Sequence, residues 1–150
     1  MTDLRKANRG LVIAAPSSGS GKTVVTLGLI RHLSAANRDV ASAKAGPDYI
    51  DPAFHAVAGG RHCLNLDPWA MRPSTLAATA AGLNADTIIC EGVMGLFDGA
   101  FVKSDKTGGD GSTAELSWRT GWPVVMVIDA RAQAASAAAV LKGFAEFQPD

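Results

Sequence analysis

The feature that most constrains this chain is a Gly/Ser-rich segment, Ser17-Ser18-Gly19-Ser20-Gly21-Lys22-Thr23, set between an apolar run and a helical pattern. The preceding run, Leu11 to Ala15, suits a strand buried on both faces of a parallel sheet. After Lys22 the apolar residues recur at helical spacing as far as Asn37. Glycines let backbone N–H groups approach phosphate oxygens, and a helix N-terminus adds positive partial charge. This strand–loop–helix arrangement therefore predicts a phosphate-binding loop.

The residues predicted to bind a nucleotide are Ser18, Gly19, Ser20, Gly21, Lys22 and Thr23. Lys22 places a full positive charge near the transferred phosphoryl group, and the Thr23 hydroxyl is a ligand for Mg²⁺. The general pattern G-x-x-x-x-G-K-[ST] begins with Gly, where this chain has Pro16. Proline removes one N–H and fixes φ, so it alters the entry to the loop and leaves Gly21-Lys22-Thr23 intact.

Three further apolar runs, Val40 to Lys44, Asp86 to Cys90 and Val124 to Ile128, are predicted strands. Helical patterns are expected over 73–81, 112–120 and 132–147, the second opened by the capping-box pair Ser112 and Glu115. Alternating strands and helices indicate an α/β fold, a parallel sheet with helices on both faces, as in phosphate-loop NTPases. An open sheet of four strands is small. We therefore expect residues 1–150 to be the N-terminal part of a longer polypeptide, with the domain incomplete at its C-terminal end.

Composition excludes several classes of protein. Of 150 residues, 47% are hydrophobic, enough for a packed core, and 14 basic residues balance 14 acidic ones. The balanced charge predicts no nucleic-acid partner, and the absence of a long apolar run predicts no membrane span. A polar N-terminus and two separated cysteines, Cys63 and Cys90, indicate a cytoplasmic protein with reduced thiols. A zinc site formed by these cysteines with His55 and His62 is an alternative, although the spacing lacks paired ligands.

Charged residues stand where the predicted strands end. Asp48 and Asp51 follow the second strand, Glu91 ends the third and Asp129 ends the fourth. Ligands of parallel sheets gather at this edge, so one of these carboxylates is expected to bind metal, directly or through water. Lys44 ends a strand at the same edge and would offset negative charge on a phosphate or a substrate carboxylate. The alternatives are solvated carboxylates, above all for Asp129, and a surface lysine at position 44.

Two longer segments carry a family resemblance, A-G-P-D-Y-I-D-P over 45–52 and E-G-V-M-G-L-F-D-G over 91–99, with the shorter N-L-D over 65–67. They resemble signature segments of the cobyrinate and hydrogenobyrinate a,c-diamide synthases, within the dethiobiotin-synthetase-like amidoligases. The resemblance runs from about Leu11 to the end of the chain. It implies an ATP- and Mg²⁺-dependent ligase in which a side-chain carboxylate of a corrinoid precursor is phosphorylated and ammonia then displaces phosphate.

The resemblance also implies roles for individual residues. The metal set is Thr23, Asp48 and Glu91, and the catalytic residues are Lys22, Lys44, Asp48 and Glu91. Tyr49, Asp51 and Asp98 are expected to bind substrate because they lie in the signature segments; Asp98 could instead cap the loop that follows it. In this family ammonia comes from glutamine through a C-terminal glutaminase domain, which these 150 residues do not include.

Other functions stay open at this point. A nickel-tetrapyrrole a,c-diamide synthase carries similar segments, and dethiobiotin synthetase shares the chemistry but is disfavoured by G-P-D-Y-I-D-P. A partitioning ATPase that dimerises over nucleotide is the alternative from another class. It is disfavoured because Pro16-Ser17-Ser18 lacks the second lysine expected there. The sequence leaves open whether the substrate carries cobalt, the order of the two amidations and the oligomeric state, with a homodimer as one alternative.

Overall fold

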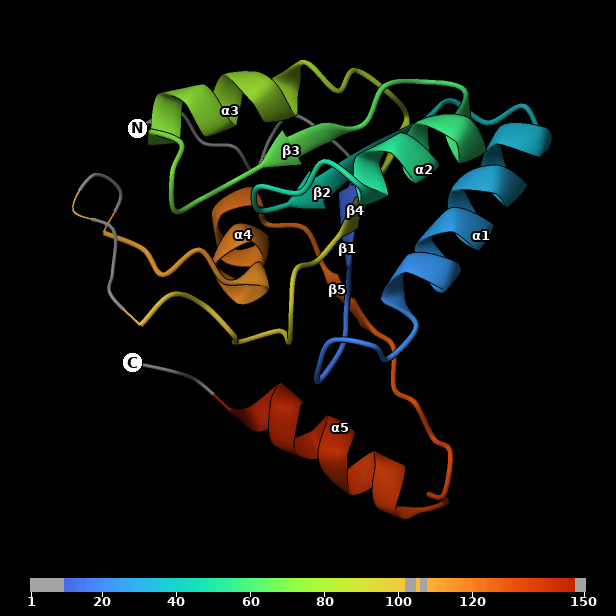
Figure 1. Ribbon diagram of the computed structural model, residues 1–150, viewed down its shortest axis with the longest axis vertical. Coiled ribbons are helices and arrows are strands. Elements are labelled where there is room, and N and C mark those ends of the chain that lie inside the picture. Colours follow the sequence, from blue (N-terminus) through green and yellow to red (C-terminus); the bar gives the residue numbers. More distant parts are fainter. Residues whose placement is uncertain (1–9, 102–104, 106–107, 148–150) are drawn as a thin grey trace.

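The computed structural model describes residues 10–101, 105 and 108–147, and in this part of the chain five strands alternate with five helices (Figure 1). In chain order the elements are β1 (Gly10–Ala14), α1 (Lys22–Ala35), β2 (Val40–Ala45), α2 (Asp51–Gly59), β3 (Leu64–Leu66), α3 (Pro73–Ala81), β4 (Thr87–Glu91), α4 (Thr113–Thr120), β5 (Val124–Met126) and α5 (Ser136–Glu146).

The strands form one parallel sheet in the order β3-β2-β4-β1-β5. β1 and β2 follow each other in the chain but are separated in the sheet by β4. Parallel neighbours need a long crossover connection, which helices supply here. All strands therefore end at the same edge of the sheet, and the loops that follow β1, β2 and β4 meet there.

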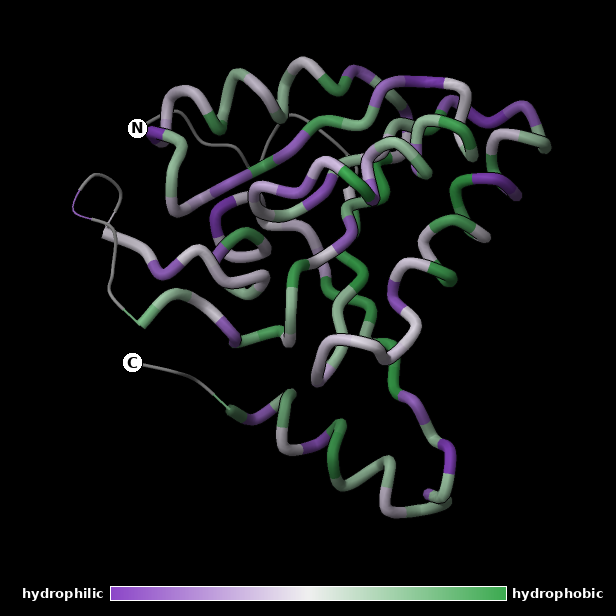
Figure 2. Tube along the Cα trace, in the orientation of Figure 1, coloured by the Kyte–Doolittle hydropathy of each residue, from purple (hydrophilic) through white to green (hydrophobic). Residues whose placement is uncertain are grey.

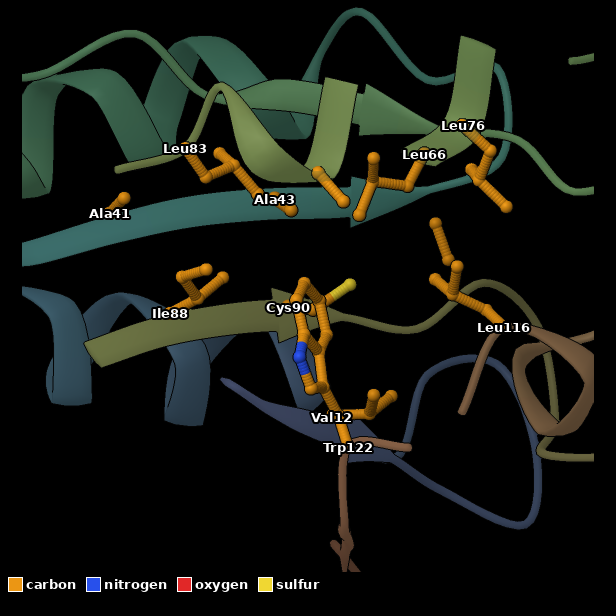
Figure 3. Close-up of a cluster of buried hydrophobic side chains, with 12 residues drawn as sticks. Val12, Ala41, Ala43, Leu66, Leu76, Leu83, Ile88, Cys90, Leu116 and Trp122 are labelled. Atoms are coloured by element: carbon orange, nitrogen blue, oxygen red, sulfur yellow. The ribbon is translucent and has the colours of Figure 1, made fainter. Parts of the chain in front are cut away.

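Helices cover both faces of the sheet, as the sequence pattern predicts. Successive side chains of a strand point to opposite faces, so each strand contributes to two cores. The core on the side of α3 and α4 includes Val12, Leu66, Leu76, Ile88 and Leu116 (Figure 3). The core on the side of α1 includes Ile13, Ile30, Val40 and Ile89. In Figure 2 hydrophobic and hydrophilic residues are interspersed along α1. The residues that α1 buries are Lys22, Thr26 and Ile30, whereas Val24 of the expected apolar stripe is 75% exposed.

The sequence pattern misses two elements, and the sheet has five strands rather than four within the described residues. β3 is only three residues long, too short to show periodicity, and it exists because Leu64 to Leu66 pair with β2. α2 was not predicted, and in the structure its large apolar residues, Phe54 and Val57, are exposed while His55 is buried. α3 has the predicted bounds. α1 ends at Ala35, and Asn37 follows in the left-handed region with φ 55°.

The C-terminal elements differ most from expectation. The apolar run 124–128 forms only the three-residue β5, because it lies at the edge of the sheet and is half-covered. The predicted helix over 132–147 begins at Ser136, and α5 has no buried residue. It lies apart from the sheet in Figure 1. Its Phe144 ring stacks on the Phe97 ring, with ring centroids 5.6 Å apart. Within the described residues no helix is long and apolar enough to cross a membrane.

Ser112 caps α4, and its replacement should measurably destabilise the fold. Its hydroxyl accepts the N–H of Glu115 at 3.1 Å, one half of the predicted capping box. The Glu115 carboxylate does not return to Ser112 but accepts the N–H of Gly111 at 2.7 Å. We expect Ser112→Ala to lower the free energy of unfolding by about 1 kcal/mol in urea denaturation. Ser74→Ala, on the exposed first turn of α3, is the control and should change it by under about 0.5 kcal/mol. Equal effects would contradict the capping role.

Candidate nucleotide-binding and metal site

The loop between β1 and α1 has the backbone that a phosphate site needs. Gly19 and Gly21 have φ of 79° and 91°, a region that side chains disfavour. A Cβ at either position would meet no atom within 4 Å, so backbone conformation rather than space requires glycine. Gly21 begins α1 without a side-chain cap. No side chain there competes with an anion for the first N–H groups of the helix.

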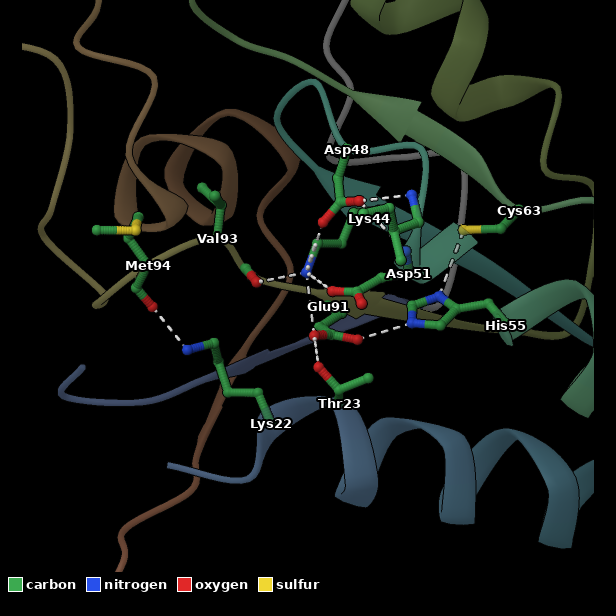
Figure 4. A network of polar contacts seen from close by, with 12 residues as sticks. Lys22, Thr23, Lys44, Asp48, Asp51, His55, Cys63, Glu91, Val93 and Met94 are labelled. Carbon is green, nitrogen blue, oxygen red and sulfur yellow. Dashed lines mark hydrogen bonds and ion pairs between the residues drawn. The ribbon is translucent and has the colours of Figure 1, made fainter. Parts of the chain in front are cut away.

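Lys22 is buried beside this loop at 7% exposure. Its Nζ donates to the Ser17 carbonyl at 3.1 Å. It also donates to the Met94 carbonyl at 2.7 Å (Figure 4). Burial and the nearby charge of Lys44 lower the pKa of Lys22. Within the described residues its hydrogen bonds go to carbonyl oxygens alone. The ammonium charge therefore remains available for a phosphate group.

Glu91, the last residue of β4, is the centre of a buried polar network (Figure 4). Its Oε1 accepts from Thr23 Oγ1 at 2.6 Å and from Lys44 Nζ at 3.0 Å. Its Oε2 lies 2.7 Å from His55 Nε2. Burial alone would raise the pKa of Glu91, but the hydrogen bonds from His55 and Thr23 and the charge of Lys44 lower it to about 2. The carboxylate is thus ionised and held on both oxygens.

Lys44 is not a surface lysine, because it is only 4% exposed. Its Nζ lies 2.7 Å from Asp51 Oδ2, 3.0 Å from Glu91 Oε1 and 3.7 Å from Asp48 Oδ2. Burial alone would lower the pKa of Lys44, but the hydrogen bond to Asp51 and the charge of Glu91 raise it. One ammonium therefore holds together three carboxylates that come from the loop after β2, from α2 and from β4.

The two aspartates are set by a turn that leads into α2. Asp48 Oδ1 accepts the N–H groups of Ile50 and Asp51 at 2.8 and 3.2 Å. Burial alone would raise the pKa of Asp48, but these two N–H bonds and the charge of Lys44 together lower it. Asn65 donates its side-chain amide to the Asp48 carbonyl. The turn leaves Asp48 Oδ2 and Asp51 Oδ2 directed at Lys44.

Most of the predicted site residues surround one pocket of about 390 Å³ at the carboxyl edge of the sheet. It is lined by nine of them: Ser18, Gly19, Gly21, Lys22, Thr23, Lys44, Asp48, Asp51 and Glu91. Ser20 lines a neighbouring pocket of about 350 Å³, which also contains Asp129. Asp129 lies on the surface with its carboxylate 2.6 Å from Arg131, and this contact lowers its pKa.

Two predicted substrate residues lie outside this pocket. Tyr49 is 86% exposed. Asp98 accepts the N–H of Gly95 at 2.9 Å, so it caps the turn before it rather than the loop after it. It also lines an apolar groove with Phe97 and α5. The substrate roles of both residues stay predictions.

The donor chemistry around Glu91 fits Mg²⁺, a hard cation that prefers oxygen ligands. Thr23 Oγ1 and Glu91 Oε1 lie within 2.6 Å of each other and line the pocket. In the described part of the chain no three His, Cys, Asp or Glu side chains are arranged to hold a metal by themselves. Mg²⁺ commonly uses only one or two carboxylates together with substrate phosphates, so the remaining ligands would come from the nucleotide. Because no such group of three metal-binding side chains is found among the described residues, a zinc site formed by His55, His62, Cys63 and Cys90 has no support.

The sequence argument missed the role of His55, which it considered only as a zinc ligand. His55 is fully buried and contacts Glu91. It also missed the Met94 carbonyl, the partner of Lys22, on a residue with φ of 50°. The signal for His55 was its position four residues after Asp51, which places both on one side of α2.

The paired groups Glu91 and His55 predict how stability depends on pH. Burial alone would lower the pKa of His55, but hydrogen bonds to Cys63 and Glu91 raise it to about 9 from a usual 6.5. Its stabilising contribution is complete below pH 6.5 and is lost as pH rises through 9. The contribution of Glu91 is complete above pH 4.5 and is lost as pH falls towards 2.

Without bound ligand, the free energy of unfolding should therefore be highest between about pH 4.5 and 6.5. The free energy of unfolding should fall by an amount on the order of 3 kcal/mol as pH rises from this range to above 9, and by a similar amount as pH falls towards 2. Urea denaturation at a series of pH values measures this profile. A free energy of unfolding that stays constant from pH 6.5 to 9 would contradict the pairing of His55 with Glu91.

The parallel sheet, the glycine loop at the start of α1 and the Lys22–Thr23–Glu91 cluster define a phosphate-loop nucleotide-binding domain. The sequence profile of the CobQ/CobB/MinD/ParA nucleotide binding domain matches residues 11–149, so the chain belongs to that family.

Curated relatives named hydrogenobyrinate a,c-diamide synthase are similar over almost the whole chain. The relative from Brucella ovis is 49% identical over 145 residues, 95% of this chain and 32% of its own length. Those from Rhizobium meliloti and Rhodobacter capsulatus are 50% and 52% identical, over 94% and 91% of this chain and 32% and 31% of their own lengths. The chain thus spans about a third of the length of these relatives.

Proposed function

We propose that this chain is the nucleotide-binding part of an enzyme that amidates the a and c side-chain carboxylates of hydrogenobyrinic acid at the expense of ATP. The observation that carries the proposal is the identity of about 50%, over more than nine-tenths of the chain, with relatives that bear this activity in their names. The pocket supports it, because it combines a phosphate loop with two lysines and three carboxylates.

The chemistry explains why such a pocket is needed. A carboxylate resists attack by ammonia because it is negatively charged and has no good leaving group. In the proposed reaction a carboxylate oxygen attacks the γ-phosphorus of ATP, and the bond to the ADP oxygen breaks. Ammonia then attacks the carbonyl carbon of the acyl phosphate, loses a proton, and inorganic phosphate leaves. The transfer step needs positive charge around the phosphoryl group and an attacking oxygen in line.

The residues of this chain supply those requirements. The N–H groups at the start of α1 bind phosphate oxygens, and Lys22 moves from the carbonyls of Ser17 and Met94 to the γ-phosphate. Thr23 and Glu91, with Asp48, would hold Mg²⁺. When bound, the ion neutralises phosphate charge. The Lys44 ammonium offsets the mutual repulsion of the Asp48, Asp51 and Glu91 carboxylates and holds them in place. Asp51, Tyr49 and Asp98 would orient the substrate.

The remaining parts of the proposal concern the intact protein. Ammonia would come from glutamine through a glutaminase domain outside these 150 residues, as part of cobalamin biosynthesis in the cytoplasm. Neither cysteine of this chain is suited to be the glutaminase nucleophile. Cys90 is completely buried, and that burial raises its pKa. Cys63 is engaged with the His55 ring at 3.4 Å.

The direct test incubates the intact protein with ATP, Mg²⁺ and glutamine, and with either cobyrinic or hydrogenobyrinic acid. Mass spectrometry should show two carboxylate-to-amide conversions, with hydrogenobyrinic acid preferred. Preference for cobyrinic acid would correct the substrate and retain the reaction. No conversion of either acid, alongside normal ATP binding, would refute the proposal and favour the alternatives: a nickel-tetrapyrrole amidase, dethiobiotin synthetase or a partitioning-type nucleotide switch.

A further inference from the structure

His55 is a fully buried side chain of α2 that touches the proposed metal site without lining its pocket. Its Nε2 lies 2.7 Å from Glu91 Oε2, and its Nδ1 lies 3.4 Å from Cys63 Sγ (Figure 4). Both ring nitrogens are therefore engaged. A buried imidazole held at both nitrogens cannot turn freely, so it offers Glu91 a donor in one fixed direction.

α2 delivers His55 and Asp51 to the site together. The two residues are four apart, which places them on the same side of a helix. Asp51 Oδ2 reaches Lys44 Nζ at 2.7 Å, and one turn later His55 reaches Glu91. The same helix therefore positions both the cation that holds the carboxylates and the central carboxylate.

The two oxygens of Glu91 have separate partners. Oε2 faces His55, away from the pocket, and Oε1 faces Thr23 and Lys44. Without a donor at Oε2, this carboxylate, only 1% exposed, would keep an unsatisfied oxygen in the interior. It could then rotate to share Lys44 or Thr23 between both oxygens, and Oε1 would lose its fixed direction.

We propose that His55 is a positioning residue, which holds Glu91 so that Oε1 alone is presented to the divalent cation that accompanies the nucleotide. The inference rests on the proposed function, because it assumes that Glu91 is a metal ligand. His55 acts through Glu91 and does not itself touch metal or nucleotide. Residues that orient metal ligands in this way typically contribute 10- to 100-fold in metal affinity or activity.

The test compares two side chains that differ by one methylene group. Glutamine places an amide N–H near the position of Nε2 of histidine, whereas asparagine is too short to reach Glu91. Each variant of the intact protein is mixed with a non-hydrolysable ATP analogue and Mn²⁺, and free Mn²⁺ is measured from its electron paramagnetic resonance signal. His62→Asn, at the exposed neighbouring histidine, is the surface control.

We expect His55→Asn to weaken Mn²⁺ binding by about 10- to 100-fold, whereas His55→Gln and His62→Asn stay within about threefold of the unmodified protein. Thermal unfolding of each variant establishes that it is folded. If folded His55→Asn binds Mn²⁺ as tightly as His55→Gln, the proposal is overturned and His55 is a packing residue only. If His55→Asn does not fold, His55→Gln decides, because a tenfold loss in that folded variant also overturns the proposal.

The two proposals can fail separately. Mn²⁺ binding that depends on the His55 hydrogen bond, in a protein that amidates neither corrinoid acid, would retain the positioning role and refute the proposed reaction. If the protein amidates a corrinoid acid and both His55 variants keep normal Mn²⁺ affinity, the proposed reaction is retained and the positioning role is refuted.

Discussion

Lys22→Ala is expected to lower kcat/KM of the ATP-dependent amidation by about 100- to 1,000-fold, the usual effect of removing a main electrostatic stabiliser of a transition state. The ammonium of Lys22, which lines the pocket, is hydrogen-bonded to the Ser17 and Met94 carbonyls. Water can replace the ammonium at these carbonyls, so the free energy of unfolding should change by less than about 1 kcal/mol. Steady-state kinetics and urea denaturation measure the two quantities.

The matched control for this variant is Lys142→Ala. Lys142 is a surface lysine of α5 whose ammonium lies 3.7 Å from Glu146 and whose side chain is 72% exposed. Its removal should leave both the kinetics and the stability unchanged. Normal turnover by a folded Lys22→Ala protein would refute the assignment of the phosphate loop.

Glu91→Gln is expected to damage both folding and function. The substitution removes the charge that faces Lys44 and His55, which are themselves buried. Breaking a buried ion pair from one side commonly costs about 3–5 kcal/mol, because the partner charge remains in the interior. Lys44 keeps Asp51, so we expect the lower end, about 3 kcal/mol, together with a loss in turnover of at least about 100-fold.

Asp48→Asn is the informative comparison for Glu91→Gln. The Asp48 side chain is 29% exposed, and asparagine retains an oxygen for the N–H groups of Ile50 and Asp51. Stability should therefore change by less than about 1 kcal/mol, while the Mg²⁺ concentration needed for half-maximal turnover rises. Unchanged kinetics across a Mg²⁺ titration would remove Asp48 from the metal set, and full stability of Glu91→Gln would contradict the buried network.

The sequence predicts best the elements whose local pattern and tertiary role agree. The apolar strands β1 and β4 are buried on both faces, α3 has the predicted bounds, and the Gly-Lys-Thr loop lies where its flanking pattern predicts. β3 and the shortened β5 depend on pairing with a neighbouring strand rather than on their own composition. α2 could not be predicted from an apolar face, because its large apolar residues, Phe54 and Val57, are exposed rather than packed against the core.

The same distinction applies to the site. Residues that end the strands, such as Lys44 and Glu91, follow from the topology of a parallel sheet, and the structure brings them within 3.0 Å of each other. His55 could not be placed in this way, because its partner is 36 residues away and the helix that carries it was not predicted. The convergence of three carboxylates on Lys44 was also beyond the sequence, since it depends on the turn that directs Asp48.

The strand order has a consequence for synthesis on the ribosome. β4 lies between β1 and β2, so the first two strands to emerge do not pair with each other, and both wait for β4 as their shared partner. Lys44 likewise cannot form its ion pair with Glu91 until residue 91 has left the exit tunnel. The same holds for the hydrogen bond of Thr23 to Glu91, which lies 68 residues further along the chain. Contacts of such long sequence separation form slowly. Until β4 inserts between β1 and β2, Lys44 therefore stays in water although it is buried in the folded protein. The insertion of β4 joins the two strands into one sheet and brings Glu91 to Thr23 and Lys44 in the same step.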